Sequence, residues 1–529
     1  MTERLGIVVS GSLNKGVEVR LDSSTSIEDM AVGRFVTIEG AKRRFFGMIT
    51  DVSLGMTDQR LSLTPPDVSD PFIAEVLAGT STFGTLHVSP SLVIGGDADA
   101  ILEGPQPVKT IPSHFSAVNL ATQEDVELVF GTEDEKRFFI GNPLDMEVKL
   151  CLNLEELVKR SNGIFGKSGT GKTFLTRILL IGMLQKSRAV NLVFDMHNEY
   201  GWAGTREGGP PVKGLKQLFQ SRVAVFTLDE ENSRHRGVST DGVVRIGYDE
   251  IEPDDIALLR QTLNLTDLAV EAVYQLYRKF GRGWIQDTLD LKVDEGLPEG
   301  LSVHEGTLLN LQRGLATIRR LPFIEPHSPA NAVKAIMEHL DRGTNVVLEF
   351  GRYRDITAYI LVANMLSRRI YAQYQSRVEK ADAAGNESMR PRPLVITIEE
   401  AHKFLNPIVA GQTIFGTIAR EMRKYNVTLL VIDQRPSGID SEVMSQMGTK
   451  ITCLLDNDRD IDSVLAGVSG RNELKSVLAK LAAKQQALIF GHAVPMPVAF
   501  QPREYGSAQS YRDFAPTEPA EEEIEKLWD

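Results

Sequence analysis

The sequence predicts an α/β protein in which a mainly parallel sheet is preceded by a small β domain and interrupted by an inserted helical subdomain. Three observations predict this arrangement. The first part of the chain has short runs of alternating apolar and polar residues, the rest alternates apolar runs with helical patterns, and one stretch shows helical spacing alone. The predicted boundaries are residues 1–120 for the β domain, 121–249 and 341–510 for the α/β core, 250–340 for the inserted subdomain and 511–529 for an acidic tail.

The β domain is predicted from patterning with a period of two. Val17, Val19 and Leu21 alternate with polar neighbours, and residues 35–39 and 46–50 form two further short runs. Clusters of Gly, Asp and Ser break these runs at short intervals, which is typical of a small barrel or sandwich.

The α/β core is predicted from uninterrupted apolar runs, because strands of a parallel sheet are buried on both faces. A polar stretch from Arg377 to Pro393 is expected to be an exposed loop before a central strand. In the inserted subdomain, helical spacing runs from Leu268 to Tyr277 and stops at Gly281. The candidate strands of the core are Gly163–Gly166, Val190–Asp195, Val223–Leu228, Val346–Phe350, Leu394–Ile398, Val427–Ile432 and Ile451–Leu455.

Composition narrows the function only slightly. The chain has 58 Lys+Arg against 71 Asp+Glu, a net charge of −13, which argues against a protein that coats DNA nonspecifically. A ring with basic groups inside and acidic groups outside stays compatible with this charge. Cys151 and Cys453 lie in separate apolar stretches, so neither a disulfide framework nor a zinc site is expected. No run of about 18 apolar residues and no apolar signal region is present, which predicts a cytoplasmic protein without a membrane span.

The strongest motif, Gly166–Thr173, fits G-x-x-x-x-G-K-[ST] and lies between a short apolar run and an apolar-periodic helix. Glycines let the backbone wrap closely, so that its N–H groups point at the phosphates of ATP. Lys172 is expected to contact the β- and γ-phosphates, and the Thr173 hydroxyl to bind Mg²⁺. The expected nucleotide-binding residues are Gly166, Lys167, Ser168, Gly169, Thr170, Gly171, Lys172 and Thr173.

A pair of carboxylates follows the buried run 394–398. Glu399 and Glu400 stand at the carboxyl end of a strand, where α/β sheets bind ligands. Nucleotide hydrolysis uses one acid to hold Mg²⁺ through water and another to orient the attacking water. We expect Glu399 in the first role and Glu400 in the second, with a Glu pair that merely begins a helix as the alternative.

Two other strand ends carry polar groups expected near the nucleotide. Gln434 is expected to contact the γ-phosphate or the attacking water, unless its segment is a plain strand-to-turn connection. Asp195 ends the strand after the phosphate-loop helix and is expected to add an acid to the site. His197 lacks a second His at metal-ligand spacing, so no metal role is assigned to it.

Together these motifs resemble the HerA branch of the HerA/FtsK ATPases. The β domain is similar to the small barrel of that family, and the resemblance extends along nearly the whole chain. The matching motifs are Leu157–Arg160, Gly166–Thr173, Asp195–Tyr200, Glu399–His402, Arg420–Tyr425, Gln434–Ser437 and the late run from Ala487 to Pro497.

The resemblance implies a RecA-like ATPase core in a homohexameric ring, with ATP and Mg²⁺ at each subunit boundary and double-stranded DNA in the central channel. It makes Glu400 the catalytic acid and Gln434 the sensor of the γ-phosphate. Arg423 and Arg160 both match positions for an arginine that reaches the neighbouring subunit's nucleotide, and the sequence does not choose between them. A surface salt bridge is the alternative for each.

Two residues depart from the family pattern. Glu399 stands where Asp is usual, and its longer side chain is expected to shift Mg²⁺ and slow turnover. Asn198 stands where Gly is usual, and Asn tolerates the left-handed conformation that such a turn needs.

Contacts with DNA are sought among basic residues near strand ends. Arg352 and Arg354 follow one strand, and Arg206 and Lys213 lie in a loop rich in Gly and Pro. Each pair is a candidate to meet DNA phosphates, with a solvated charge cluster as the alternative.

The predicted function is therefore an ATP-driven translocase and helicase that moves double-stranded DNA. The resemblance implies a nuclease or sirtuin-like effector docked on the N-terminal barrel, acting in DNA-end processing and repair or in antiviral defence. The alternative is an ATP-regulated hexameric scaffold that controls a partner with little translocation. A secretion pump is disfavoured because no membrane anchor is expected.

Overall fold

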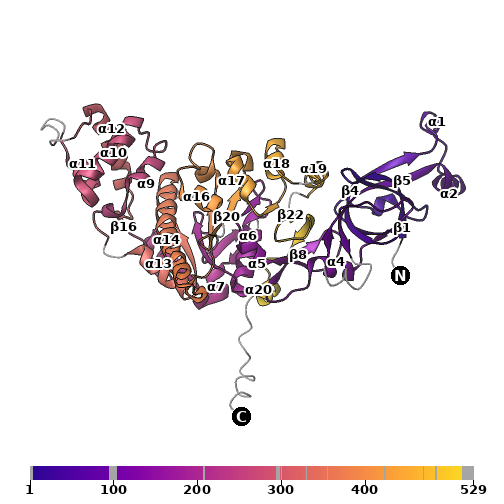
Figure 1. The fold of residues 1–529 in the computed structure, drawn as a ribbon, viewed down its shortest axis with the longest axis horizontal. Coiled ribbons are helices and arrows are strands. Elements are labelled where there is room, and N and C mark those ends of the chain that lie inside the picture. Colours follow the sequence, from indigo (N-terminus) through magenta and orange to yellow (C-terminus); the bar gives the residue numbers. More distant parts are fainter. Residues whose placement is uncertain are drawn as a thin grey trace, which may run out of the picture.

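The structure is a computed structural model, in which three parts follow one another along the longest axis (Figure 1). A β-barrel lies at one end, a central sheet with helices lies in the middle, and a group of helices lies at the other end. The structure describes residues 4–94, 104–206, 209–292, 298, 301–328, 331–353, 355–421, 424–468, 470–482 and 485–514.

A closed barrel forms the N-terminal part. Its strand order is β2-β1-β7-β3-β4-β5-β6, and an additional pairing of β2 with β5 closes the sheet. The closure of the sheet confirms the barrel rather than the sandwich, and Val17, Val19 and Leu21 of β2 are buried while their neighbours are not. The elements are β1 (Arg4–Ser12), β2 (Gly16–Leu21), β3 (Phe35–Glu39), β4 (Arg44–Met56), α1 (Arg60–Leu63), α2 (Pro71–Thr80), β5 (Thr82–Ile94), β6 (Gln106–Pro107) and β7 (Ala117–Leu120).

A twelve-stranded sheet forms the centre, in the order β15-β14-β18-β11-β19-β20-β10-β21-β22-β23-β8-β9. The strands from β15 to β21 pair in parallel, and the remaining four add an antiparallel edge. Parallel pairing gathers the carboxyl ends of β10, β11, β18, β19 and β20 at one edge of the sheet. The strands are β8 (Arg137–Pro143), β9 (Leu150–Asn153), β10 (Asn162–Phe165), β11 (Val190–Asp195), β14 (Val223–Thr227), β15 (Gly242–Val243), β18 (Asn345–Glu349), β19 (Leu394–Glu399), β20 (Val427–Asp433), β21 (Thr449–Thr452), β22 (Ala487–Gly491) and β23 (Val498–Pro502).

Helices cover this sheet, and α6 (Lys172–Gln185) is the one that the phosphate loop enters. Every residue from Leu175 to Leu184 is buried, so the start of α6 is held firmly beneath the loop. The other helices around the sheet are α4 (Gln123–Phe130), α5 (Leu154–Val158), α7 (Leu215–Phe219), α8 (Glu230–His235), α13 (Ala332–Asp341), α14 (Ile356–Ala384), α15 (His402–Leu405), α16 (Ile414–Glu421), α17 (Ser441–Gln446), α18 (Asp458–Val464), α19 (Arg471–Ala479) and α20 (Ala508–Phe514).

The exposed loop predicted from Arg377 to Pro393 is wrong in its first half. Helix α14 continues to Ala384 and ends at Gly385, which has the left-handed conformation of a helix C-cap. Val378 and Ala381 stay buried within the charged stretch, so a narrow apolar stripe extends the helix where the average composition is polar.

The helices at the far end, α9–α12, pack on one another around buried apolar side chains. Helix α10 ends at Gly281, as its sequence predicts. Trp284 of α11 is fully buried, and its indole N–H donates to the Ile251 carbonyl at 3.0 Å. The elements are α9 (Pro253–Leu258), α10 (Asp267–Phe280), α11 (Trp284–Asp290) and α12 (Glu305–Arg319), with the short pair β16 (Ile246–Gly247) and β17 (Ile324–Glu325) beneath them.

Candidate active site

The phosphate loop joins β10 to α6. Gly166, Gly169 and Gly171 have φ values of 150°, 77° and 99°, which glycine adopts without steric cost. A Cβ on Gly166 would also lie only 2.8 Å from the Cβ of Cys453. The loop therefore depends on its glycines, and it leads into the N-terminus of a 14-residue helix, where backbone N–H groups favour anions.

Lys172 lies at the start of α6 and turns back over the loop. Its Nζ donates to the Lys167 carbonyl at 2.7 Å, and the Thr170 hydroxyl donates to the same carbonyl at 2.8 Å. Burial lowers the pKa of Lys172, while the charges of Glu400 and Glu399 act in the opposite direction. The ammonium group is thus close to both predicted catalytic acids.

Glu400 and Gln434 meet across the ends of two neighbouring strands. Gln434 Nε2 donates to Glu400 Oε1 at 3.2 Å, because β19 and β20 pair in parallel up to Glu399. Glu400 has a φ of 49°, and a non-glycine residue in this left-handed conformation is often found at a functional site. Both side chains line the same cavity.

Glu399 is the last residue of β19, and its side chain is buried. Tyr200 Oη donates to its Oε1 at 2.9 Å, whereas Oε2 has no hydrogen-bond partner among the described residues. Burial, assisted by the charge of Asp195, raises the pKa of Glu399 to about 8. This carboxyl is therefore largely protonated at pH 7, and a cation placed beside it would favour its ionised form.

Asp195 ends β11 and lies behind the site. Its carboxylate accepts backbone N–H groups from Glu199 at 2.8 Å, Tyr200 at 2.7 Å and Gly201 at 3.2 Å. Burial raises the pKa of Asp195 even though these donors favour its charged form. Asp195 shapes the turn that carries His197 and Glu199, and these two residues face the nucleotide cavity.

Sequence reasoning missed Glu349 and Arg236. Glu349 ends β18 in register with Asp195, is fully buried and pairs with Arg236 at 2.7 Å. Burial, followed by the charge of Asp195, raises the pKa of Glu349 to about 7. The sequence signal that could have identified Glu349 is the one that identified Glu399, namely an acidic residue at the end of an apolar strand.

Sequence reasoning also missed Arg177 of α6, which is buried in an apolar helix. It donates to the Glu199 carbonyl, and its guanidinium carbon lies 5.4 Å from the ring centroids of both Phe174 and Tyr505. Phe174 lies one turn earlier in α6, but Tyr505 comes from a distant segment, so the sequence alone does not reveal this cluster.

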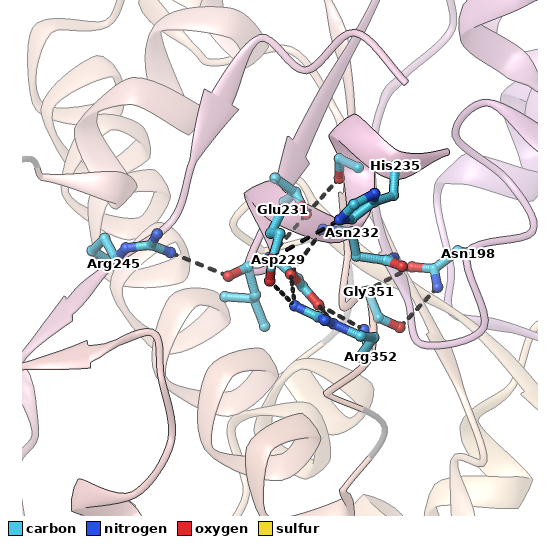
Figure 2. A network of polar contacts seen from close by, with 11 residues as sticks. Asn198, Asp229, Glu231, Asn232, His235, Arg245, Gly351 and Arg352 are labelled. Carbon is cyan, nitrogen blue, oxygen red and sulfur yellow. Dashed lines mark hydrogen bonds and ion pairs between the residues drawn. The ribbon is translucent and has the colours of Figure 1, made fainter. Parts of the chain in front are cut away.

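Figure 2 shows a polar network that joins the turn after β11 to the loop after β18. Asn198 Nδ2 donates to the Gly351 carbonyl, and Asn198 Oδ1 accepts the Gly351 N–H, both at 2.9 Å. Asn198 has a φ of 58°, so the expected left-handed turn is confirmed. Its amide adds two bonds that the glycine usual in the family could not make.

Arg352 belongs to the same network and has two acidic partners (Figure 2). Its Nε lies 2.8 Å from Asp229 Oδ2, and its Nη2 lies 2.6 Å from Glu231 Oε2. Asp229 also caps α8 through the Asn232 N–H at 3.1 Å. The loop after β18 is therefore tied to α8 as well as to the turn after β11.

Arg160 and Lys213 make contacts outside this network. Arg160 follows α5, where its carbonyl accepts from Asn162 Nδ2 at 2.7 Å. Lys213 ends β13 (Gly209–Lys213), with its Nζ 5.3 Å from the Tyr511 ring centroid. For Arg206, in β12 (Ala203–Arg206), only the backbone is described, and Arg354 and Arg423 lie outside the described residues.

The phosphate loop and the ends of β19 and β20 line one cavity of about 680 Å³. Residues 168–173 of the phosphate loop lie along it, and Glu399, Glu400 and Gln434 line its catalytic end. Deep polar cavities with perturbed carboxyl pKa values are typical of active sites. The arrangement supplies a phosphate cradle, a cation and two carboxylates to a single ligand.

The residues present fit Mg²⁺ held jointly with phosphates. Thr173 lines the cavity, and Glu399 Oε2 is a buried oxygen without a partner in the described chain. No group of three His, Cys, Asp or Glu residues within the described ranges is suited to hold a metal alone. Mg²⁺ commonly uses one or two carboxylates together with substrate phosphates and water.

Family models match both main parts of the chain. A model described as the central domain of helicase HerA matches residues 138–370, and a HAS barrel domain model matches residues 5–99. The chain belongs to the HerA helicase family. With the phosphate loop and strand-end carboxylates described above, this HerA-family protein is a nucleotide-binding ATPase.

Curated HerA proteins are similar over most of this chain. The DNA double-strand break repair helicase HerA of Pyrococcus furiosus is 26% identical over 71% of this chain and 71% of its own. The protein of the same name from Sulfurisphaera tokodaii is 22% identical over 93% of this chain and 91% of its own. A solved structure of the conjugative coupling protein TrwB covers 73% of this chain and 93% of its own at 11% identity, with a TM-score of 0.45.

No helix in the described part of this HerA-family chain is both long and apolar enough to cross a membrane.

Proposed function

We propose that this HerA-family protein is the motor of a homohexameric ring that hydrolyses ATP to move double-stranded DNA through a central channel. The observation that carries the proposal is the convergence of Lys172, Glu400 and Gln434 on one cavity. Phosphoryl transfer needs a cation at the phosphates, a group that orients water and a group that responds to the γ-phosphate. The DNA substrate is proposed from the name of the relatives, DNA double-strand break repair helicase.

Each residue has a proposed role in this reaction. Thr173 and Glu399 would hold Mg²⁺, which neutralises charge on the phosphates when bound. Glu400 would orient the attacking water, and Gln434, already bonded to Glu400, would couple that water to the γ-phosphate. Either Arg160 or Arg423 of one subunit would complete the neighbouring subunit's site.

The proposed DNA contacts are the β12–β13 hairpin, with Arg206 and Lys213, and the loop that carries Arg352 and Arg354. Arg352 would have to exchange Asp229 for a DNA phosphate. Its contribution to the free energy of DNA binding is therefore reduced by the free energy needed to break this ion pair. Phosphate contacts of this kind give affinity without sequence preference.

An effector, a nuclease or a sirtuin-like protein, is proposed to dock on the N-terminal barrel. The support is an arm between β4 and β5 that exposes large apolar side chains, with Leu63 82% and Phe72 72% accessible. Exposed apolar groups gathered on one projecting segment are typical of protein-contact surfaces. The choice of effector would decide between DNA-end processing and antiviral defence.

The test is ATP turnover by the purified full-length protein, with and without linear duplex DNA, alongside Glu400→Gln. Stimulation by DNA that vanishes in the variant is the expected result. If an assembled hexamer hydrolyses ATP at the same rate with and without DNA, the motor proposal is overturned.

A second candidate, the ATP-regulated scaffold, is favoured by one observation. Glu399 stands where Asp is usual in the family, and its longer side chain would shift Mg²⁺ and slow hydrolysis. A scaffold predicts a nucleotide-dependent hexamer whose slow hydrolysis is indifferent to DNA, so the same turnover assay separates the two.

A further inference from the structure

We propose that the base of the bound nucleotide stacks on Phe174 and is enclosed by the segment Gln501–Tyr505 that ends and follows β23. This inference rests on the proposed function, because it takes the phosphates to bind at Gly166–Thr173. It assigns a ligand to the end of the cavity that the phosphate chemistry does not use.

The cavity continues past the phosphate loop in one direction. Glu399, Glu400 and Gln434 line it at the ends of β19 and β20, and Phe174, Ile178 and the segment Gln501–Tyr505 line it toward β23, which lies several strands away in the sheet order. A nucleotide whose terminal phosphate faces Glu400 must extend its sugar and base toward β23. Phe174, Ile178, Pro502 and Tyr505 give this part of the lining an apolar and aromatic surface that could receive a flat ring, beside the polar residues Gln501, Arg503 and Glu504.

Phe174 is placed to meet a base. It directly follows Thr173 in the first turn of α6 and is only half-buried, whereas its neighbour Leu175 is buried. Its ring centroid lies 5.9 Å from that of Tyr505, with the planes tilted by 44°. Behind both rings, the guanidinium group of Arg177 lies 5.4 Å from each and fixes the pair from the protein side.

The opposite wall is held rigidly by the sheet. Gln501 and Pro502 pair with β8, and the Arg503 N–H donates to the Ile140 carbonyl at 2.9 Å. The Tyr505 hydroxyl donates to the Lys213 carbonyl at 2.5 Å. A wall fixed before binding lowers the entropic cost of ordering it around a ligand.

The chemistry of this end predicts a limited selectivity. The polar side chains of Gln501 and Glu504 are exposed, so they offer a base no desolvated hydrogen bond. Strong discrimination between similar ligands requires buried polar groups that a wrong ligand leaves unpaired. The site should therefore favour purines for their larger stacking face and separate ADP from GDP by less than about tenfold.

The test compares a ligand that has a base with one that lacks it. Binding of ADP and of inorganic pyrophosphate, each with Mg²⁺, is measured by calorimetry on the full-length protein. Phe174→Leu should weaken ADP about tenfold or more, since loss of stacking on an aromatic ring has an effect of this size, and leave pyrophosphate unchanged. Phe174→Trp should keep ADP binding, and Phe115→Leu, at an exposed phenylalanine of the N-terminal barrel, is the matched control.

The possible outcomes distinguish a failure of the base-stacking proposal from a failure of the proposed phosphate site. The base-stacking proposal is overturned if Phe174→Leu binds ADP as tightly as the unaltered protein does. It is also overturned if this variant loses affinity for ADP and for pyrophosphate equally. Lys172→Ala that retains both ligands overturns the phosphate site itself. If GDP binds more than a hundredfold more weakly than ADP, a buried polar group must recognise the base, and this result would contradict binding by stacking.

Discussion

Glu400 is the residue on which turnover should depend most. Replacing its carboxylate by an amide in Glu400→Gln keeps the size and the contact with Gln434 but removes the base. We expect kcat to fall by roughly 10²–10⁴, with ATP affinity unchanged. Steady-state hydrolysis and nucleotide binding measured on the same preparation check this, and a loss below about fivefold would contradict the catalytic role.

Glu349 should make stability depend on pH. Its pKa is about 7 in the folded chain, against an ordinary value of 4.5, so between these pH values the folded state binds more protons than the unfolded state. Stability should therefore decrease as the pH rises from about 4.5 to about 7 and then level off. Glu349→Gln should flatten this part of the profile, measured as the urea midpoint between pH 5 and pH 8.

At the residue scale, sequence patterns found Asp195 and Glu399 at the ends of apolar strands, but they missed Glu349 at the end of β18 and the surroundings of all three acids. Glu399 and Glu400 were placed at a strand end because that rule is local. The partner of Glu399, Tyr200, comes from 199 residues away, and so the burial that raises its pKa could not be predicted. Asp195 followed the same rule, yet it accepts three backbone N–H groups and lies behind the cavity.

Among the elements, the turn after β11 and the loop after β18 should move as one. Asn198→Gly keeps the left-handed turn but removes two buried hydrogen bonds to Gly351. We expect faster amide exchange at Gly351 and a loss of about 1–3 kcal/mol in unfolding free energy. Hydrogen exchange with mass spectrometry provides the measurement.

Asn198→Asp is the matched control for that loop. It keeps an acceptor for the Gly351 N–H but loses the donor to the Gly351 carbonyl. The exchange rate of the Gly351 amide should therefore lie between those of the unaltered protein and Asn198→Gly. Equal exchange in all three proteins would show that the loop is held by Arg352 and Asp229 alone.

The strands of the core were predictable because burial on both faces gives continuous apolar runs. Such a run can be recognised in the sequence without knowing which strand it pairs with. The end of α14 was not, since its charged stretch hides a stripe formed by Val378 and Ala381. The antiparallel edge also escaped detailed prediction. Strands β8 and β23 lie far apart in the sequence, and their pairing depends on the completed sheet.

For the whole molecule, a buried ion pair should stabilise the junction between the helical group α9–α12 and helix α14 beside the sheet. Arg368 of α14 reaches Asp255 of α9 at 2.9 Å, and Asp255 is almost fully buried. Arg368→Met should cost about 3–5 kcal/mol, because it leaves a buried carboxyl without its partner. Thermal unfolding of the full chain checks the loss.

The paired variant Arg368→Met with Asp255→Leu tests the reason for that loss. Replacing both members of a buried ion pair by apolar residues is often neutral, so stability should recover largely. A double variant no better than the single one would show that the other contacts of the two residues, Arg368 with Glu252 and Asp255 with the Glu252 N–H, carry the stability.

The N-terminal barrel is complete once β7 has formed, because β7 pairs with both β1 and β3. During synthesis, most of the chain is still to be made when β7 is translated, which takes roughly 20–80 s at ribosomal speed. The barrel therefore has time to fold beside the ribosome while the central sheet still lacks strands. Strand β8, translated soon afterwards, must wait for β23 with its hydrogen-bonding edge open, and this nascent edge is where a chaperone would be needed.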